Sequence, residues 1–300
     1  MPTVVNLDGV LGPAEHARVS VFDRGFLYGD SVYEVIRTYG RRPFEEKAHL
    51  ARLRHSAERI GFSLKWDAAR TAREIARTLD ASRGVDPVDP EAAPWNVGER
   101  YLRVVMTRGA GEIGLDPALA VDPVAVVIAQ PLAGPPVRAY REGVKVAIVG
   151  LRRAAPEAID PSAKTGAHLP NVLAVREARS AGAFEALLLD GRGFVTEGSS
   201  SNVFSVSGGV LRTPPLAAGI LEGVTRGVVL RLARGAGIGV EEAPLLPEDL
   251  EGADEVFITS TVREIVPVTR LGEHVVGAGR PGPLTGRLHA EFRAAAAGAE

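Results

Sequence analysis

Only four of the 35 basic residues in this 300-residue chain are lysines, namely Lys47, Lys65, Lys145 and Lys164. Arginine keeps its proton in proteins, so chemistry that needs a titratable amine must use one of these four. The first three stand at a helix start, at a helix–loop junction and early in a strand, where a solvated side chain is the ordinary outcome. Lys164 differs, because its surroundings, IDPSAKTGAHLPN, form a loop rich in Pro, Gly and Ser that leads into a helix with Pro170 near its first position.

A carboxylate stands inside the otherwise apolar stretch FVTEGSSSNVFSV, at residues 194–206. Phe194, Val195, Val203 and Phe204 favour β structure that is at least half buried on both sides of Glu197. A buried carboxylate needs a charged or hydrogen-bonding partner. The small residues 198–201 that follow would let the backbone pass close to a bound group.

Two further stretches could hold an anion. Gly223-Val224-Thr225 has the pattern of a helix N-terminus, where free backbone N–H groups and a threonine hydroxyl bind phosphate. In ITSTVRE, a strand over 255–259 leads to Ser260 and Thr261, so two hydroxyls are expected on a loop at the strand's end. The simpler interpretations are a plain helix cap and an ordinary strand end.

One cofactor accounts for all of these features. Pyridoxal 5′-phosphate needs an amine that forms a Schiff base with its aldehyde, a carboxylate beside its pyridine nitrogen, and a cup for its phosphate. We therefore expect Lys164 to take the aldehyde and Glu197 to face the ring nitrogen. In such a site the neutral amine of Lys164 would be the group that moves a proton.

Composition excludes several other classes of function. The chain has no cysteine, which excludes disulfides, thiolate nucleophiles and cysteine-bound metals. A formal net charge of −2 gives no bulk attraction to nucleic acid or to an anionic membrane. The six histidines show no metal-ligand spacing, so we expect no metal site. The chain start lacks the pattern of a signal peptide and no apolar run approaches about 20 residues, so we expect a cytoplasmic protein.

Two motif matches are weak. G-x-G-x-x-G occurs at 109–114 and at 277–282, but neither copy opens the helix of a βαβ unit, and chance matches are expected among 34 glycines. GSSSN, at 198–202, lacks the second glycine of a nucleophile elbow and lies between strands. A nucleotide site and a serine nucleophile are therefore the weaker hypotheses.

Both helices and strands are expected to position these residues. Helices are expected over 45–60, 66–79, 170–180 and 247–250, from about 224 and about 284, and over part of 31–39. Strands are expected over 4–7, 17–22, 101–107, 123–129, 144–149, 186–190, 255–259 and on both sides of Glu197, and a surface loop over 81–100. The mixture predicts an α+β fold with a small N-terminal α/β domain over 1–130, a Pro- and Gly-rich linker over 131–137 and a larger domain over 138–300.

Several ordered blocks are similar to the fold-type IV pyridoxal-phosphate enzymes, which include branched-chain and D-amino acid aminotransferases and aminodeoxychorismate lyases. The blocks are FDRGFLYGDSVYEVIRTY (22–39), HLARLRHSAERI (49–60), YLRVVMTRGAGEIGLDP (101–117), AKTGAHLPNVLAVREA (163–178), EALLLDGRGFVTEGSSSNVF (185–204), TPPLAAGILEGVTR (213–226) and ADEVFITSTVREIVPV (253–268). They cover nearly the whole chain. The resemblance implies a two-domain architecture whose larger domain has a β-barrel-like core, a cofactor between the domains, and a homodimer or higher oligomer in which a partner loop helps to close each site.

The resemblance also implies which residues bind the cofactor. Lys164 matches the Schiff-base lysine and Glu197 the partner of the pyridine nitrogen. Arg52, in H-x-x-R-L, matches the phosphate-binding arginine. The remaining residues that match the phosphate cup are Val224, Thr225, Ser260 and Thr261.

Substrate contacts are expected from a second group of residues. Tyr33, in GDSVYE, matches a tyrosine on the substrate side, where Thr261 and Val262 would also lie. Arg103 and Arg108 are candidates to bind the substrate carboxylate, because a guanidinium can hold it by two hydrogen bonds. An exposed strand or loop position is the alternative for each arginine.

Different motifs in the sequence favour different amino donors. EGSSSNVF and the TST of ITSTVRE resemble D-amino acid aminotransferases, and Leu169 stands where branched-chain enzymes typically have tyrosine. YLR at 101–103 and the IGLDP run resemble branched-chain enzymes. The R-x-H trap of D-specific enzymes is incomplete, because Ala110 stands two residues after Arg108, where the trap has histidine. We expect a transaminase leaning toward D-amino acids, with a branched-chain L-amino acid aminotransferase as the alternative. A lyase is the weaker interpretation, because the lyases lack the TST pattern.

Overall fold

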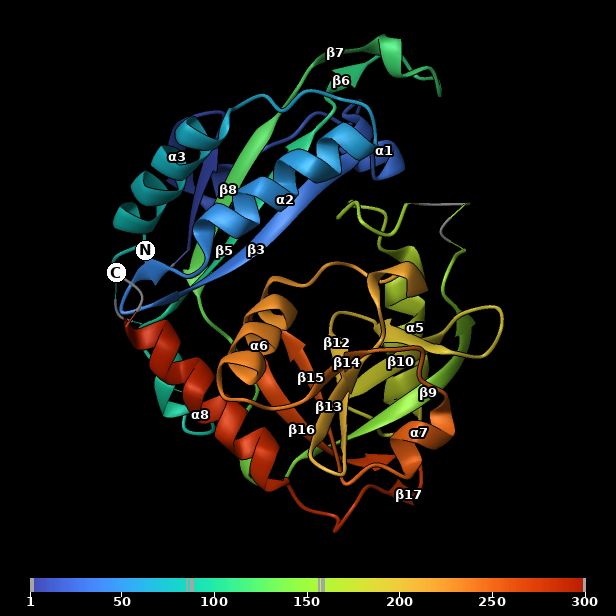
Figure 1. The fold of residues 1–300 in the computed structure, drawn as a ribbon. Helices are drawn as coiled ribbons and strands as arrows, with labels where there is room; N and C mark the ends of the chain where they lie inside the picture. The colour runs from blue at the N-terminus through green and yellow to red at the C-terminus, as the bar shows by residue number, and fades with distance from the viewer. Residues whose placement is uncertain (1–2, 85, 87–88, 156, 158–159, 299–300) are drawn as a thin grey trace. The chain divides into compact units, whose positions relative to one another are not determined.

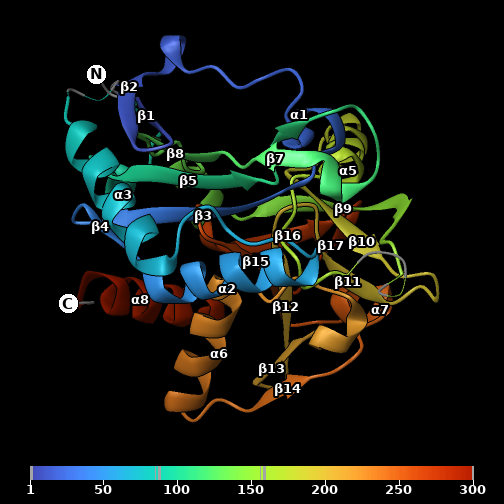
Figure 2. The ribbon, with the colours of Figure 1, turned by 90° about the horizontal axis from the view of Figure 1, so that it is seen from above.

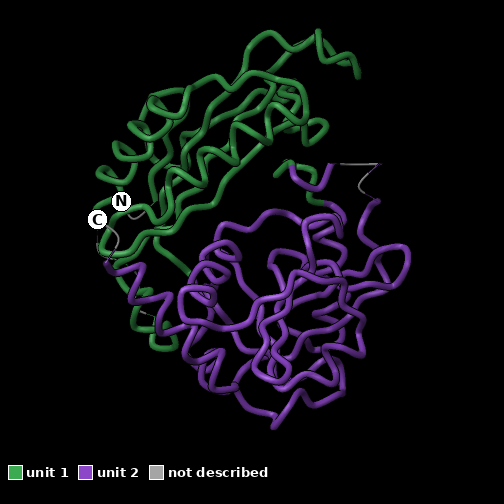
Figure 3. Tube along the Cα trace, in the orientation of Figure 1, with its two compact units in different colours: residues 1–133, 163–168 green, residues 134–162, 169–300 purple. Residues whose placement is uncertain are grey.

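The computed structural model describes residues 3–84, 86, 89–155, 157 and 160–298. The chain divides into two compact units, one of residues 1–133 and 163–168 and the other of residues 134–162 and 169–300 (Figure 3). The first division falls inside the segment 131–137, although Pro131 still ends a strand and Val137 already begins a helix. The expected bounds differ from this division at one place, since 163–168 groups with the first unit and not with 138–300.

Backbone pairing explains why 163–168 belongs to the first unit. Thr165 forms a β-bridge with Val32, the N–H of Gly166 donates to the carbonyl of Ser31 at 2.8 Å, and the N–H of Tyr33 donates to the carbonyl of Lys164 at 3.1 Å. The Lys164 segment therefore extends the sheet of the first unit at one edge.

The first unit is built on a six-stranded antiparallel sheet with the order β2-β1-β8-β5-β3-β4 (Figures 1 and 2). Its strands are β1 Val4–Leu7, β2 Val10–Pro13, β3 Ser31–Tyr39, β4 Arg42–Pro43, β5 Arg100–Thr107 and β8 Ala125–Pro131. Two long helices, α2 (Glu46–Arg59) and α3 (Ala68–Ala81), pack against the sheet. The smaller elements are α1 Arg24–Tyr28, the two-stranded sheet of β6 Ala110–Gly111 and β7 Ala120–Asp122, and short 3₁₀ turns at Ala14–His16, Pro94–Asn96 and Pro117–Leu119.

Alternation along β3 and β5 separates two faces of this sheet. The helix-covered face carries fully buried apolar side chains, which include Val32, Ile36, Leu102, Val104 and Met106. Tyr33 and Arg103 have the opposite parity in the register, so they lie together on the other face.

The second unit contains a nine-stranded mixed sheet with the main order β11-β10-β9-β16-β15-β12-β13-β14 (Figure 1). Its strands are β9 Val144–Arg152, β10 Glu185–Leu189, β11 Val195–Gly198, β12 Asn202–Ser207, β13 Val210–Thr213, β14 Val240–Glu242, β15 Glu255–Ser260, β16 Glu264–Leu271 and β17 His274–Val275. The sheet curls so far that Val195, on one edge strand, bridges Leu245, which follows the strand at the other edge. This curl confirms the expected barrel-like core and the α+β class.

Helices cover the curled sheet on its outside. Helix α5 (Leu169–Ser180) packs on β9 and β10, while α6 (Val224–Gly235) and α8 (Pro283–Gly298) pack against each other and against β15 or β16. The short helices are α4 Val137–Arg141, α7 Pro247–Glu251 and a 3₁₀ turn at Leu216–Ala218. Among the described residues, no helix is long and apolar enough to cross a membrane.

Two expected elements are wrong. Residues 17–22 form no strand, because they pair with no neighbouring strand and leave Val19, Val21 and Phe22 exposed. Residues 31–39 form strand β3 without any helix, since the β-branched and aromatic residues of SVYEVIRTY suit a central strand. In the expected loop 81–100, residues 85, 87 and 88 lie outside the described residues.

Candidate active site

Lys164 is held beside the ring of Tyr33. Its backbone N–H donates to the hydroxyl of Ser56 on α2 at 3.0 Å, and its side-chain nitrogen Nζ lies 4.5 Å from the centre of the Tyr33 ring. A Cβ at Gly166 would stand 2.2 Å from Ser31 Oγ, so the close approach of this segment to β3 requires glycine. Sequence reasoning named Lys164 and Tyr33 separately, and the first unit brings them together.

Two more side chains meet at the same ring. The guanidinium carbon of Arg103 lies 4.2 Å from the Tyr33 ring centre, within the range of a cation–π contact, and its Nη1 lies 3.5 Å from the hydroxyl of Tyr101. His168 meets the ring edge-on, with 4.8 Å between ring centres and 81° between planes. Tyr33 is thus the point at which the candidate amine and one candidate carboxylate-binding arginine converge.

His168 is a site residue that sequence reasoning missed. Burial, followed by the positive charges of Lys164 and Arg103, lowers the pKa of His168 to about 4. Its imidazole is therefore neutral near pH 7. The only signal in the sequence was its position four residues after Lys164.

Arg52 is paired with a buried carboxylate of the first unit. Its Nε and Nη2 donate to the two carboxylate oxygens of Glu34 at 2.7 and 2.8 Å, and His49 Nδ1 lies 2.7 Å from the same carboxylate. Burial by itself raises the pKa of Glu34, but the charge and hydrogen bonds of Arg52 outweigh it, with a smaller contribution from His49, and lower the pKa to about 2. Glu34 thereby fixes the orientation of the guanidinium that was expected to bind phosphate.

The guanidinium of Arg108 is held by hydrogen bonds within the first unit. Its Nε donates to Asp30 at 2.7 Å, and its two terminal nitrogens donate to the carbonyls of Gly61 at 2.8 Å and Ile60 at 2.7 Å. Asp30 also pairs with Arg24 at 2.9 Å. Because all three nitrogens of Arg108 already donate to the protein, Arg103 is the better-placed candidate for a substrate carboxylate.

In the second unit, Glu197 lies near the end of β11 and is buried. Its Oε1 is 2.9 Å from Nη2 of Arg153, and its Oε2 accepts the N–H of Leu221 at 3.0 Å. Arg153 is a second residue that the sequence did not reveal, because it sits in an unpatterned loop that precedes residue 160. The structure thus supplies the charged partner that a buried carboxylate requires.

The segment 219–223 connects Glu197 to the start of α6. Asn202 donates to the carbonyl of Leu221 at 3.1 Å, and a Cβ at Gly223 would stand 1.9 Å from Asn202 Oδ1. Gly223 is the N-cap of α6 and has no side chain to accept from the first-turn N–H groups. Val224 and Thr225 therefore begin a helix whose backbone donors suit a phosphate, which fits the expected cofactor.

Ser260, Thr261 and Val262 lie at a tight turn between β15 and β16. Ser260 pairs with Glu264 across the hairpin, so Thr261, Val262 and Arg263 form a three-residue loop. Glu264 closes it with a φ of 56°, a left-handed conformation that is usual after such a loop but rarely adopted by glutamate.

Within the described part of the chain, no group of three His, Cys, Asp or Glu residues could hold a metal ion. The arrangement instead offers an amine next to an aromatic ring and an arginine in one unit. In the other unit it offers a buried carboxylate and a helix start capped by glycine.

Comparison with known proteins places the chain in a family. Residues 31–271 match the sequence model of the class IV amino-transferases. A Methanocaldococcus jannaschii protein, provisionally named a branched-chain-amino-acid aminotransferase, is 40% identical over 289 residues, which are 96% of this chain and 95% of that protein. The D-alanine aminotransferase of Bacillus licheniformis is 34% identical over 281 residues, which are 94% of this chain and 93% of that protein.

A solved structure agrees with this placement. A branched-chain amino acid aminotransferase from T.th., crystallised with pyridoxamine 5′-phosphate, superimposes with a TM-score of 0.89 at 30% identity, over 98% of this chain and 94% of that chain. Both the sequence model and the relatives therefore extend over most of the chain. The chain belongs to the class IV amino-transferases, a family of pyridoxal-phosphate-dependent enzymes, and is an aminotransferase.

Proposed function

We propose that this aminotransferase binds pyridoxal 5′-phosphate through Lys164 and Glu197 and transfers amino groups by a ping-pong cycle. The observation that carries the proposal is the position of the Lys164 amine, 4.5 Å from the Tyr33 ring centre, on the same ring that Arg103 contacts. The buried Glu197 and the glycine-capped start of α6 support it from the second unit.

When bound, the cofactor supplies an aldehyde that takes up an amino group and a protonated ring that accepts the electron pair released at Cα. Lys164 Nζ would accept the proton from the substrate Cα and would deliver it to C4′, the carbon of the former aldehyde group, which requires the neutral form of the amine. Glu197, held by Arg153, would keep the ring nitrogen protonated by its negative charge.

Binding of the phosphate is proposed for donors at two loops and one helix start. The backbone N–H groups of Val224 and Thr225 and the hydroxyls of Thr225, Ser260 and Thr261 would donate to its oxygens. Arg52 stays a proposed phosphate ligand, with Glu34 as the residue that positions it.

For the substrate, we propose a branched-chain L-amino acid as the preferred donor. The most similar of the relatives described above and the solved structure are both named for branched-chain substrates. Arg103 lies beside the hydroxyl of Tyr101, so that Y-x-R on β5 presents an arginine and a phenol on one face, while Tyr33 adds an aromatic wall. A D-amino acid is the second candidate, favoured by EGSSSNVF and by the likeness to a D-alanine aminotransferase. Thr261 and Val262 stay proposed contacts on the substrate side.

Initial rates with L-leucine and with D-alanine, each with 2-oxoglutarate, decide between the two donors. We expect kcat/KM for L-leucine to exceed that for D-alanine by at least about tenfold, with no product when the 2-oxo acid is left out. A preference for D-alanine would transfer the assignment to the second candidate. Activity without any 2-oxo acid would contradict a transamination cycle and favour a lyase. Lys164→Ala is the control for background.

We also propose that the enzyme forms a homodimer. Residues 24–28 and 109–116 hold each other, since Arg24 donates to the carbonyl of Gly114 at 2.7 Å and the N–H of Gly114 donates to the hydroxyl of Tyr28 at 3.2 Å. These two segments nevertheless leave Phe26, Ile113 and Leu115 at least 70% exposed. Large apolar side chains gathered in this way indicate a surface that another protein chain covers.

A further inference from the structure

Another buried carboxylate, Glu185 on β10, lies outside the machinery described so far. It is 2% exposed, and five donors point at it. The backbone N–H of Ala186 donates at 2.9 Å, the hydroxyls of Ser200 and Ser201 at 3.1 and 3.2 Å, and the hydroxyl of Ser199 and the guanidinium of Arg263 also donate. This is a complete shell for a carboxylate.

The partners of Glu185 come from two loops that carry proposed site residues. The serines form the turn that directly follows Glu197, and the turn is tight, with the N–H of Gly198 donating to the carbonyl of Ser201 at 2.6 Å. Arg263 is the last residue of the loop that carries Thr261 and Val262. One carboxylate therefore ties the loop beside the proposed ring-nitrogen partner to the loop of the proposed phosphate cup. It also explains the run of three serines, whose hydroxyls all turn to Glu185.

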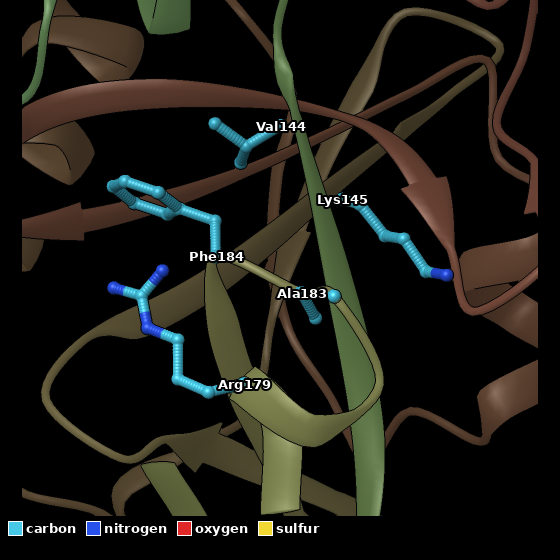
Figure 4. A pocket seen from close by; sticks show the side chains of 6 residues that line it. Val144, Lys145, Arg179, Ala183 and Phe184 are labelled. Carbon is cyan, nitrogen blue, oxygen red and sulfur yellow. The ribbon is translucent and has the colours of Figure 1, made fainter. Parts of the chain in front are cut away.

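Arg263 is fixed on its other sides as well. Its guanidinium carbon lies 5.1 Å from the centre of the Phe184 ring, and its carbonyl accepts the hydroxyl of Tyr140 at 3.1 Å. Arg179 contacts the same ring at 5.8 Å, and together with Phe184 and Lys145 it lines a pocket of about 320 Å³ (Figure 4). The six residues that line this pocket include none of the proposed site residues, so we assign it no part in the reaction.

We propose that Glu185 and Arg263 are positioning residues that hold the 199–201 and 261–263 loops in the arrangement that binds the cofactor. The inference rests on the proposed function, because it assumes that Glu197 and Thr261 bind the same cofactor. We call Glu185, Arg263 and Ser199–Ser201 the Glu185 clamp. Its members act through Glu197 and Thr261 and do not themselves react.

The protonation state of Glu185 suits this role. Burial raises the pKa of the carboxyl group, but the charge of Arg263 and the hydrogen bonds from Ser199, Arg263 and Ala186 outweigh it, so the pKa lies below its ordinary value. The carboxylate therefore stays ionised at neutral pH. An amide of the same shape could not accept from all five donors, and it would leave the Arg263 charge unpaired.

The test is a cofactor titration of Glu185→Gln, followed by absorbance and by protein fluorescence, on apoenzyme prepared from the full chain. We expect this variant to bind pyridoxal phosphate about tenfold more weakly than the wild type does, although the substitution alters neither Glu197 nor Thr261. Hydrogen exchange of the apoenzyme should become faster in peptides that cover 198–202 and 260–264. Peptides from α5 should keep their wild-type rates.

Arg263→Met removes the other partner of the same ion pair, whose side chain is more exposed than that of Glu185. This variant tests the positioning role if Glu185→Gln does not fold. We expect a similar loss of affinity, partial recovery in Arg263→Lys, and no further loss in the double variant, because partners in one ion pair are not additive. The matched control is Glu255→Gln. Glu255 is a buried carboxylate at the opposite end of β15, where it accepts the N–H groups of Leu284 at 2.9 Å and Thr285 at 2.7 Å.

The control separates positioning from general stability. Glu255→Gln should lower the melting temperature and leave cofactor affinity as in the wild type. If folded Glu185→Gln and Arg263→Met bind cofactor as tightly as the wild type, or if Glu255→Gln weakens binding equally, the clamp has no positioning role. A wild-type protein that binds no pyridoxal phosphate would instead end the proposed function, while the exchange rates would still show whether Glu185 couples the two loops.

Discussion

At Glu197 the carboxylate is buried, ion-paired and hydrogen-bonded to a backbone N–H group, which are the conditions that let a protein keep a charge away from water. Arg153 and the N–H of Leu221 hold the carboxylate in place, one at each oxygen. The same logic applies to Glu34, where Arg52 and His49 stabilise a fully buried charge. Both carboxylates thus depend on a neighbouring arginine.

Replacing Glu197 by Gln should separate binding from turnover. The amide keeps the shape of the side chain but cannot hold a proton on the ring nitrogen, so kcat should fall at least about 100-fold while cofactor remains bound. Steady-state rates and the visible absorbance of the purified protein measure the two effects. Glu241→Gln, at an exposed ion pair with Arg212, is the control. Unchanged turnover in Glu197→Gln would remove the role assigned to this carboxylate.

Glu34 makes stability depend on pH in the acid range. Its pKa is about 2 in the folded protein and 4.5 without that environment, so the stabilisation is complete above about pH 5 and is lost as the pH falls toward 2. The loss should amount to about 3 kcal/mol of unfolding free energy. Urea unfolding between pH 6 and pH 3 should show about 2 kcal/mol of this loss, because in the folded protein the carboxylate is still mostly ionised at pH 3. Glu34→Gln should be less stable at neutral pH and should show a flatter acid limb, and an equally steep limb would contradict this assignment.

Some of the candidate site residues could be predicted from the sequence, and others could not. Lys164, Glu197 and Tyr33 stand in distinctive local patterns, and the structure gives each a surrounding that suits its expected role. Arg153 contacts Glu197, and His168 contacts Tyr33. Each pair is far apart along the chain, so no local spacing in the sequence predicts these contacts. Arg108 donates to Asp30 and to the carbonyls of Gly61 and Ile60, and its place in the sequence indicates none of these contacts.

At the scale of elements, the start of α6 is the part whose geometry matters most for phosphate. Gly223→Ala would place a Cβ 1.9 Å from Asn202 Oδ1, so either the helix start or Asn202 must move. We expect pyridoxal phosphate to bind about tenfold more weakly and the unfolding free energy to fall by about 1–3 kcal/mol. Cofactor titration and urea unfolding give the two values.

Gly227→Ala on the same helix provides the control for that substitution. Its added Cβ would have only Arg231 Nη1 nearby, at 3.9 Å, so the helix should gain up to about 1 kcal/mol and cofactor affinity should not change. Equal affinities in the two glycine variants would mean that the start of α6 does not bind the phosphate.

Elements were predictable where a local pattern agreed with the tertiary fold. The helix over 45–60 was visible in the sequence from its apolar spacing, and it is present as α2. Strand β3 was mistaken for partial helix because most of its residues are buried whichever face they lie on, so SVYEVIRTY lacks the alternation expected of a half-buried strand. Residues 17–22 resembled a strand because apolar and polar residues alternate in ARVSVF, but Val19, Val21 and Phe22 are exposed in the structure.

For the whole molecule, the two-unit division follows from backbone pairing more than from composition. The Pro- and Gly-rich segment at 131–137 marks the first change of unit, whereas the return of 163–168 to the first unit depends on its pairing with β3, which no composition signal reveals. The proposed Schiff-base lysine is thereby placed in the unit that also holds Tyr33 and Arg103.

Dimer formation is the prediction at this scale. Replacing Ile113 and Leu115 together by Asp should leave the fold of the subunit intact and convert the dimer to monomer, since two charges would enter an apolar interface. Light scattering after size-exclusion chromatography measures the mass. Val10→Asp, at an equally exposed apolar residue outside these segments, should remain dimeric. A wild-type mass of one chain would contradict the proposal.

The central claim is that the amine of Lys164 is the one that forms the covalent link to the cofactor. Two of the other lysines are already engaged, Lys65 with Asp8 and Lys145 with Glu273. Reduction of the holoenzyme with borohydride, digestion and mass spectrometry locates the adduct directly. The account predicts a phosphopyridoxyl group on the peptide that contains Lys164 and none in Lys164→Ala. An adduct on Lys47, Lys65 or Lys145, or no adduct at all, would contradict it.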